Sequence, residues 1–161
     1  LGAPRQGCEQ MQAVLEQTRR SSERYMMVRC IDGLAEIMLA AGDTRRCRAY
    51  GDELLAIAES NSLRELEAGA RRWRGQALLA EKNYAEAQAE LSRAAALAED
   101  IGRVRLQMDA DDALARLFAA QGQSDAAQRH AAKARAIVET IEKSLESSGL
   151  EAQLHMVGKA Q

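Results

Sequence analysis

The sequence predicts an all-α protein, a right-handed α–α superhelix built from stacked helical hairpins. The main observation is an internal repeat with a period of 40 residues. Aligned on that period are Ala35, Gly75 and Ala115, and likewise Met38, Leu78 and Phe118. Small residues recur where small ones stood, and large apolar residues where large ones stood. A fixed period of this size is typical of a helical solenoid, in which each hairpin buries its apolar face by stacking on its neighbours.

The composition favours the same fold class. The chain has 161 residues, one proline and 3% aromatic residues, and it is rich in alanine. These features favour helices over β-sandwiches and barrels. The length suits one continuous core, so we expect residues 1–161 to form a single helical-repeat domain.

Residues 4–20 are the first predicted element. Their apolar positions match the second helix of the later hairpins, since Met11 falls where Leu91 and Ala131 stand. We expect this segment to be the second half of a hairpin or a cap on the stack. Because the chain begins at Leu1 rather than at a methionine, we also expect it to be a piece of a longer protein.

The first complete hairpin is expected over residues 22–61. Gly42 and Asp43 form the turn between its two helices, with Asp43 as the N-cap of the second helix. Gly51 stands inside that second helix, where a glycine costs about 1 kcal/mol relative to alanine. A close approach by a neighbour such as Met11 accounts for this glycine, and simple tolerance is the alternative.

The second hairpin is expected over residues 62–101. Ser62 and Asn83 each precede a glutamate by three residues, which predicts a capping box at the start of each helix. Trp73 is the single tryptophan and stands where the other repeats have small residues. A large residue opposite small ones suits interdigitated packing, so we favour a core role for Trp73 over ligand stacking.

The third hairpin is expected over residues 102–147. Phe118 faces inward in its first helix, and the second helix runs long, over about 124–146. Residues 148–161 are expected to form a C-terminal cap or a tail.

These hairpins resemble the tetratricopeptide repeat, over about residues 23–141. The matching residues are Leu34, Ala35, Met38, Gly42, Asp43, Leu54, Gly75, Leu78, Asn83, Tyr84, Ala87, Leu91, Ala94, Leu114, Ala115, Phe118, Gly122, Ala127 and Ala134. There are departures, because the period is 40 residues rather than 34, the closing proline is absent, and Arg71 and Arg74 stand where apolar residues are usual. The longer helices look like the C-terminal arrays of bacterial signalling ATPases and maltose-regulator-like activators. HEAT-like helical repeats are the alternative on period alone.

In the tetratricopeptide family, the first helix of each hairpin lines a groove that holds a partner segment. The resemblance therefore implies a groove lined by Arg29, Asp32, Glu36, Arg72, Gln76, Asp109, Asp112 and Arg116. Asp32, Arg72 and Asp112 occupy one equivalent position in successive repeats, above an apolar floor of Leu39 and Leu79. One interpretation is a self-satisfied ladder of exposed charges, worth about 0–1 kcal/mol per pair. The other is a groove for a partner segment that brings an acidic group to Arg72.

No pattern of catalytic or metal-ligating residues emerges from the sequence. The glycines are scattered singly, and His130 and His155 have no cysteine or serine partner at a recognisable spacing. The acidic run 109–112 is expected to be a solvated helix face rather than a metal site. We therefore expect no enzymatic activity, no metal and no cofactor.

Three cysteines, Cys8, Cys30 and Cys47, lie at irregular spacing without a CxxC pair. This pattern favours buried, reduced thiols of an intracellular protein over a zinc site or a redox pair.

The charge is balanced, with 22 basic and 24 acidic residues and a formal net charge of −2. Such a balance disfavours nucleic acid as a partner, although Arg45, Arg46 and Arg48 form one local basic cluster and 71–74 another. We find no apolar run of the roughly 18 residues that a membrane span requires, and no signal peptide. We expect a cytoplasmic protein without a membrane partner.

The sequence thus predicts a non-catalytic protein-interaction or regulatory module, a C-terminal fragment of a larger bacterial signalling or transcription-regulatory protein. Its partner is expected to be a protein or peptide segment, or the upstream domains of its own chain. The alternatives are an effector- or peptide-sensing domain of a transcriptional regulator and, less favoured, a nucleic-acid-binding helical repeat. The sequence does not identify the partner, the oligomeric state or a small effector.

Overall fold

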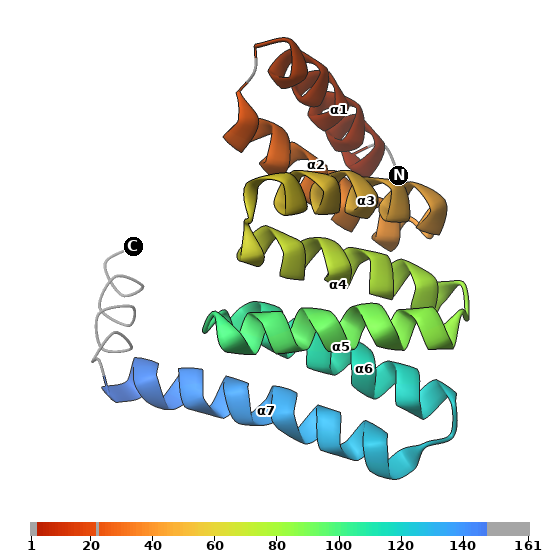
Figure 1. Ribbon diagram of the computed structural model, residues 1–161, viewed down its shortest axis with the longest axis vertical. Helices are drawn as coiled ribbons and strands as arrows, with labels where there is room; N and C mark the ends of the chain where they lie inside the picture. Colours follow the sequence, from red (N-terminus) through yellow and green to blue (C-terminus); the bar gives the residue numbers. More distant parts are fainter. Residues whose placement is uncertain (1–2, 22, 148–161) are drawn as a thin grey trace.

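The computed structural model describes residues 3–21 and 23–147, which form seven α-helices joined by short turns (Figure 1). The helices are α1 Ala3–Ser21, α2 Arg24–Ala40, α3 Thr44–Asn61, α4 Arg64–Ala80, α5 Tyr84–Asp100, α6 Val104–Ala120 and α7 Ser124–Ser147. No strand occurs in these described ranges, so the all-α prediction is confirmed. The predicted cap or tail at 148–161 lies outside the described residues.

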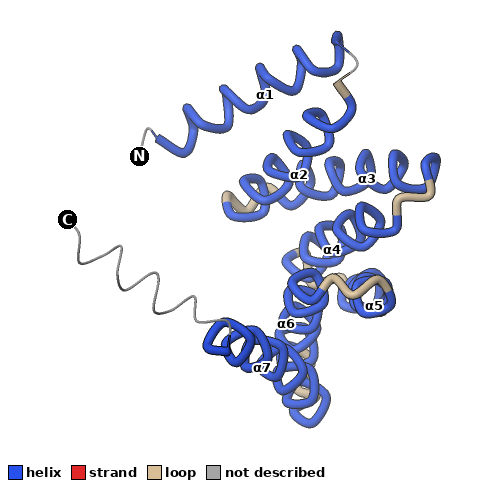
Figure 2. The backbone as a smooth tube through the Cα atoms, turned by 90° about the vertical axis from the view of Figure 1, so that its left-hand side faces the viewer, coloured by secondary structure: helices blue, strands red, loops and turns tan. Residues whose placement is uncertain are grey.

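The helices pack in chain order, each against its neighbours in sequence (Figure 1, Figure 2). In addition, α4 contacts both α2 and α6, whereas the backbones of α1, α3, α5 and α7 do not approach one another within the described residues. The stack is therefore closer on the side of α2, α4 and α6. We call the surface that these three helices share the even-helix face. This packing is compatible with a solenoid of helical hairpins.

The turns between helices repeat every 20 residues. A left-handed backbone, with φ between 54° and 76°, stands at Gly42, Ser62, Lys82, Gly102 and Gly122. In each turn the following residue donates its N–H to the carbonyl oxygen five residues earlier, at 2.8–2.9 Å. This is the Schellman arrangement, which satisfies carbonyl groups that the end of a helix leaves free. A 17-residue helix such as α2 and a three-residue turn together make half of the 40-residue repeat.

Both predicted capping boxes are wrong. Ser62 is the left-handed residue that ends α3, so the N-cap of α4 is Leu63, and no side-chain capping bond forms there. Asn83 is the N-cap of α5, but its side chain makes no capping hydrogen bond. The cap at Asp43 is confirmed, since its Oδ1 accepts a bond from the N–H of Arg46 at 3.0 Å. The Schellman turn moves the N-cap one residue beyond Ser62.

Replacing Lys82 by glycine is expected to stabilise the protein by about 1 kcal/mol, because a left-handed backbone costs a residue with a Cβ roughly 1–2 kcal/mol. Part of that gain is offset by the greater freedom of glycine in the unfolded chain. Urea unfolding of the variant measures the change, and Gly122→Ala should shift the midpoint the opposite way. A lower midpoint for Lys82→Gly would show that this turn is not strained.

The apolar core is continuous along the stack. One cluster joins α1, α2, α3 and α4 around Ile31, Leu34 and Leu54, and a second joins α4, α5, α6 and α7 around Leu91 and Leu114. These five side chains are fully buried. Fully burying a leucine or isoleucine side chain contributes about 1.5–3 kcal/mol, so the clusters hold successive helices together.

Two glycines allow helices to approach closely. A Cβ at Gly75 would lie 2.6 Å from Cγ of Leu91, so α4 and α5 meet there without room for a side chain. A Cβ at Gly51 would lie 2.8 Å from Cγ of Arg74 on α4. The expected neighbour of Gly51, Met11, packs instead against Gly33, because α1 contacts α2 rather than the backbone of α3.

The two arginines that depart from the resemblance bridge α3 and α5. Arg71 lies 3.2 Å from Glu90 and Arg74 lies 3.2 Å from the other oxygen of the same carboxylate, on α5. Toward α3, Arg74 contacts Asp52 at 3.3 Å and Arg71 contacts Glu59 at 3.7 Å. Because the backbones of α3 and α5 do not meet, these long side chains occupy the space that apolar residues fill in closer stacks.

Candidate binding groove

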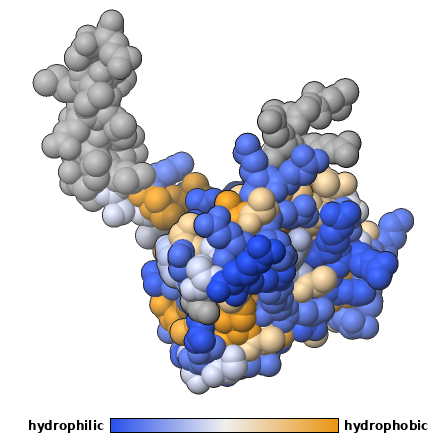
Figure 3. Space-filling view, turned by 90° about the horizontal axis from the view of Figure 1, so that it is seen from above, coloured by the Kyte–Doolittle hydropathy of each residue, from blue (hydrophilic) through white to orange (hydrophobic). Residues whose placement is uncertain are grey.

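Large apolar residues on the surface are scattered rather than gathered. Figure 3 shows a mostly hydrophilic face with separate apolar areas. The exposed large apolar residues are Val14, Tyr25, Met26, Leu63, Val104, Val138 and Ile141. They belong to different helices, so apolar exposure does not by itself mark a docking surface.

Polar groups converge on the even-helix face, where α2, α4 and α6 surround a hollow of about 350 Å³. Its lining residues are Glu36, Leu39, Ala40, Arg72, Trp73, Gln76, Arg105, Asp109, Asp112 and Arg116. We call this hollow the groove. Of the predicted residues, Arg29 and Asp32 are not in the lining, and neither is the expected floor residue Leu79.

Arg72 is the central residue of the groove, and it is mostly buried. Its side chain is 12% exposed, and its Cζ lies 3.7 Å from the centre of the Trp73 ring, in cation–π contact. Asp109 contacts it at 3.7 Å, which is an ion pair but too long for a hydrogen bond. Its buried Nε has no hydrogen-bond partner. Burial lowers the pKa of Arg72, opposed by the charges of Asp109, Asp32 and Glu36.

Trp73 anchors the groove from below. The ring is 4% exposed, which confirms its core role, and its Nε1 donates a hydrogen bond to Oδ1 of Asp32 at 2.7 Å. The thiol of Cys47 donates to the carbonyl oxygen of Trp73 at 3.7 Å. The tryptophan thus ties α2 and α3 to α4 and holds the carboxylate of Asp32 near Arg72.

The predicted ladder of Asp32, Arg72 and Asp112 does not form. Arg72 pairs with Asp109, one turn earlier on α6, and Asp112 pairs with Arg116 at 3.1 Å on its own helix. The interpretation of Arg72 as an exposed rung is wrong, because the ring of Trp73 covers its guanidinium. The pair between Asp112 and Arg116 is exposed and lies at the edge of the groove.

Three polar groups of the groove have no ion-pair or hydrogen-bond partner among the described residues. They are the carboxylate of Glu36, the amide of Gln76 and the guanidinium of Arg105, one from each even-numbered helix. Arg105 was not predicted from the sequence. Its position four residues before Asp109 places both on one face of α6, and this spacing was the available signal.

A buried acid–histidine pair lies between α6 and α7. Asp111 is 2% exposed, and its Oδ1 lies 2.7 Å from Nδ1 of His130, whose ring stacks on Phe118 at 5.3 Å. The expectation that 109–112 forms a solvated face is therefore wrong at Asp111. The sequence gave no local signal for this pair, because its members come from different helices.

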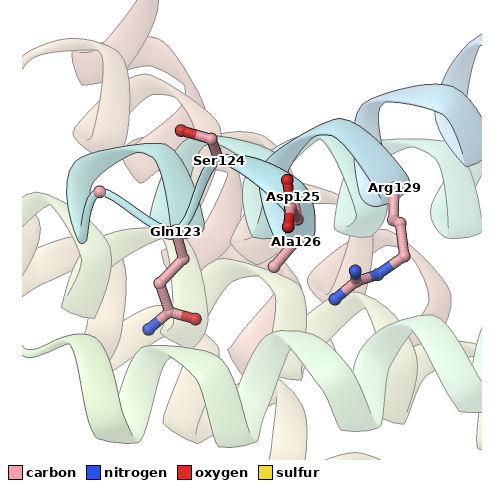
Figure 4. A pocket seen from close by; sticks show the side chains of 6 residues that line it. Gln123, Ser124, Asp125, Ala126 and Arg129 are labelled. Atoms are coloured by element: carbon pink, nitrogen blue, oxygen red, sulfur yellow. The ribbon is translucent and has the colours of Figure 1, made fainter.

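A second hollow, of about 470 Å³, lies where α7 begins (Figure 4). Its lining residues are Gly122, Gln123, Ser124, Asp125, Ala126 and Arg129. In Figure 4 the side chains of Gln123 and Ser124 point in opposite directions, so the polar groups do not converge. One turn of chain forms this hollow, and it includes none of the predicted site residues.

The cysteines differ in accessibility, since Cys30 and Cys47 are buried and Cys8 is half-buried. Burial raises the pKa of the Cys47 thiol to about 11. We expect a thiol reagent at pH 8 to label Cys8 in the folded protein, and Cys30 and Cys47 only after unfolding. Fast labelling of Cys47 without denaturant would contradict its burial.

The raised pKa of Cys47 also predicts a pH dependence of stability. An unfolded thiol loses its proton near pH 9, whereas the folded one keeps it to about pH 11. The folded state therefore binds more protons in this window, and this group makes stability fall as pH rises from about 9 to 11.

Within residues 3–21 and 23–147, no cluster of histidine, cysteine or acidic residues could hold a metal ion. None of the helices described there is long and apolar enough to cross a membrane. No protein-family model matches the chain, and no curated protein matches it. Fold and groove alone define its class, an all-α protein with a repeat-like stack of helices.

Proposed function

We propose that this chain is a non-catalytic protein-interaction or regulatory module that binds a partner segment in the groove. The observation that carries the proposal is the convergence of free polar groups on the face shared by α2, α4 and α6. Stacked helical repeats use such extended surfaces for binding. Glu36, Gln76 and Arg105 supply an acceptor, an amide and a donor without internal partners, and Leu39 and Ala40 add apolar surface.

The proposal includes the finer classification of the fold. The 40-residue repeat and the contacts of α4 with α2 and α6 support a right-handed superhelix of the tetratricopeptide type. The resemblance to arrays of bacterial signalling proteins supports a regulatory role. Free cysteines support a reducing compartment such as the cytoplasm.

A nucleic-acid-binding function has less support. Arg46 pairs with Asp43, Arg48 with Glu81, and Arg71 and Arg74 with Glu90. Their charges are therefore largely compensated, and no free basic stripe of the kind that tracks a phosphate backbone arises from them.

The test is selection of a random peptide library on the wild-type protein, followed by affinity measurements on two tryptophan variants. Gln76→Trp fills the groove and is expected to weaken the selected peptides roughly ten-fold or more. Gln128→Trp makes the same change at an exposed site on α7 and should leave affinity unchanged. Melting temperatures of both variants establish that they fold, and Glu36→Trp blocks the groove from its exposed wall if Gln76→Trp does not fold.

Three results would count against the proposal. No peptide is enriched, or the selected peptides bind both variants as tightly as the wild type, or the chain binds a labelled DNA or RNA duplex in a steeply salt-dependent manner.

A further inference from the structure

We propose that the groove selects a segment with a basic side chain, lysine or arginine, beside an apolar one, and that the basic group binds at the α2 wall. The inference rests on the proposed function and names the chemistry of its partner. It reverses the expectation that an acidic group would come to Arg72.

Arg72 is already surrounded by carboxylates. Asp109 contacts it at 3.7 Å, and the charges of Asp109, Asp32 and Glu36 all act on its guanidinium. One buried cation thus faces three anions from two neighbouring helices. An incoming carboxylate would meet these anions before it reached Arg72, whose side chain is 12% exposed. The centre of the groove therefore disfavours an acidic group.

The α2 wall is the part of the groove with uncompensated negative charge. Asp32 and Glu36 stand four residues apart, on one face of α2, and neither has a cation within 4.0 Å among the described residues. Asp32 accepts only the neutral N–H of Trp73. Like charges at this spacing repel one another, so a cation placed between them removes a repulsion as well as forming an ion pair.

The α6 wall is more nearly neutral. Arg116 pairs with Asp112 at 3.1 Å, and Arg105 has Asp109 one turn away on its own helix. The single amide on α4, Gln76, carries no charge and can bond the backbone of a bound segment. The charges of the groove are therefore uneven, with the anionic side on α2.

The end of α2 adds to this preference. Leu39 and Ala40 line the groove in the last turn of α2, and no basic residue occupies that turn. The C-terminal end of a helix carries a partial negative charge that favours cations. Leu39 and Ala40 also offer apolar surface to the methylene stem of a lysine or arginine and to an adjacent apolar side chain.

The experiment compares three pools of fluorescein-labelled 12-residue peptides in anisotropy titrations. The central pair is Leu-Lys, Leu-Gln or Leu-Glu, and the other positions are degenerate and uncharged. We expect the lysine pool to bind roughly ten-fold more tightly than the glutamate pool, with the glutamine pool between them. The preference should weaken at high salt, because the charges on the wall are partly exposed.

Glu36→Gln removes the exposed carboxylate and should abolish most of the preference for lysine. Glu86→Gln makes the same change at an exposed site on α5 and should preserve it. Asp32→Asn, which keeps an acceptor for Trp73, should reduce the preference as well.

The outcomes separate the two proposals. If the pools bind and Gln76→Trp blocks them, but glutamate is preferred or Glu36→Gln has no effect, the charge selection is wrong and the groove function stands. If no pool binds, or Gln76→Trp leaves binding unchanged, both proposals fail.

Discussion

Arg72→Glu is expected to lower the free energy of unfolding by roughly 3–5 kcal/mol, the range measured when one partner of a buried ion pair is removed. The reason is the company of this residue. The change replaces the one buried cation near Asp32, Glu36 and Asp109 by a fourth carboxylate, and it removes the cation–π contact with Trp73. Urea unfolding followed by circular dichroism measures the loss.

The matched control is Arg29→Glu, the same reversal at an exposed residue of α2. It should change stability by about 0.5 kcal/mol or less, as surface substitutions usually do. Equal and small effects of the two reversals would place Arg72 in solvent, as the sequence-based ladder supposed. For the same reason Arg72→Glu is not a suitable probe of binding.

Phe118→Ala is expected to cost roughly 3–5 kcal/mol, as large-to-small aromatic changes in a core do. Phe118 is 8% exposed, and its ring packs in the cluster that joins α4, α5, α6 and α7. The ring also supports His130, whose Nδ1 lies 2.7 Å from the buried carboxylate of Asp111. The truncation therefore opens a cavity and loosens the partner of a buried acid.

Phe118→Leu is the control, since it keeps most of the apolar volume and should cost much less than the alanine change. Chemical denaturation of both variants gives the comparison. A loss below about 1 kcal/mol for Phe118→Ala would place the ring on the surface and contradict the packing of α6 against α7.

The sequence predicted most of the architecture, because the repeat is carried by local signals. Left-handed residues at 42, 62, 82, 102 and 122 follow the same 20-residue spacing that the apolar pattern has. Periodic apolar residues define helices, and glycines mark three of the five turns. The capping boxes failed because Ser62 adopts a conformation that L-residues seldom visit, which a motif of spacing alone does not reveal.

The site was harder to predict, since its chemistry depends on contacts between helices. Alignment placed Arg72 and Asp112 at equivalent positions, but the register of α4 against α6 brings Arg72 to Asp109 instead. The burial of Arg72 follows from the orientation of the Trp73 ring, and the pairing of Asp111 from the packing of α7 on α6. Sequence spacing along one helix carries none of this information.

The most direct test of the central claim, that the even-helix face binds the partner, is an amide NMR titration of the ¹⁵N-labelled protein with a peptide selected on the wild type. The account predicts that the largest shift changes fall on groove residues of three helices, among them Glu36, Gln76 and Asp112. The largest changes falling instead on α3, α5 and α7, with these residues unmoved, would contradict it.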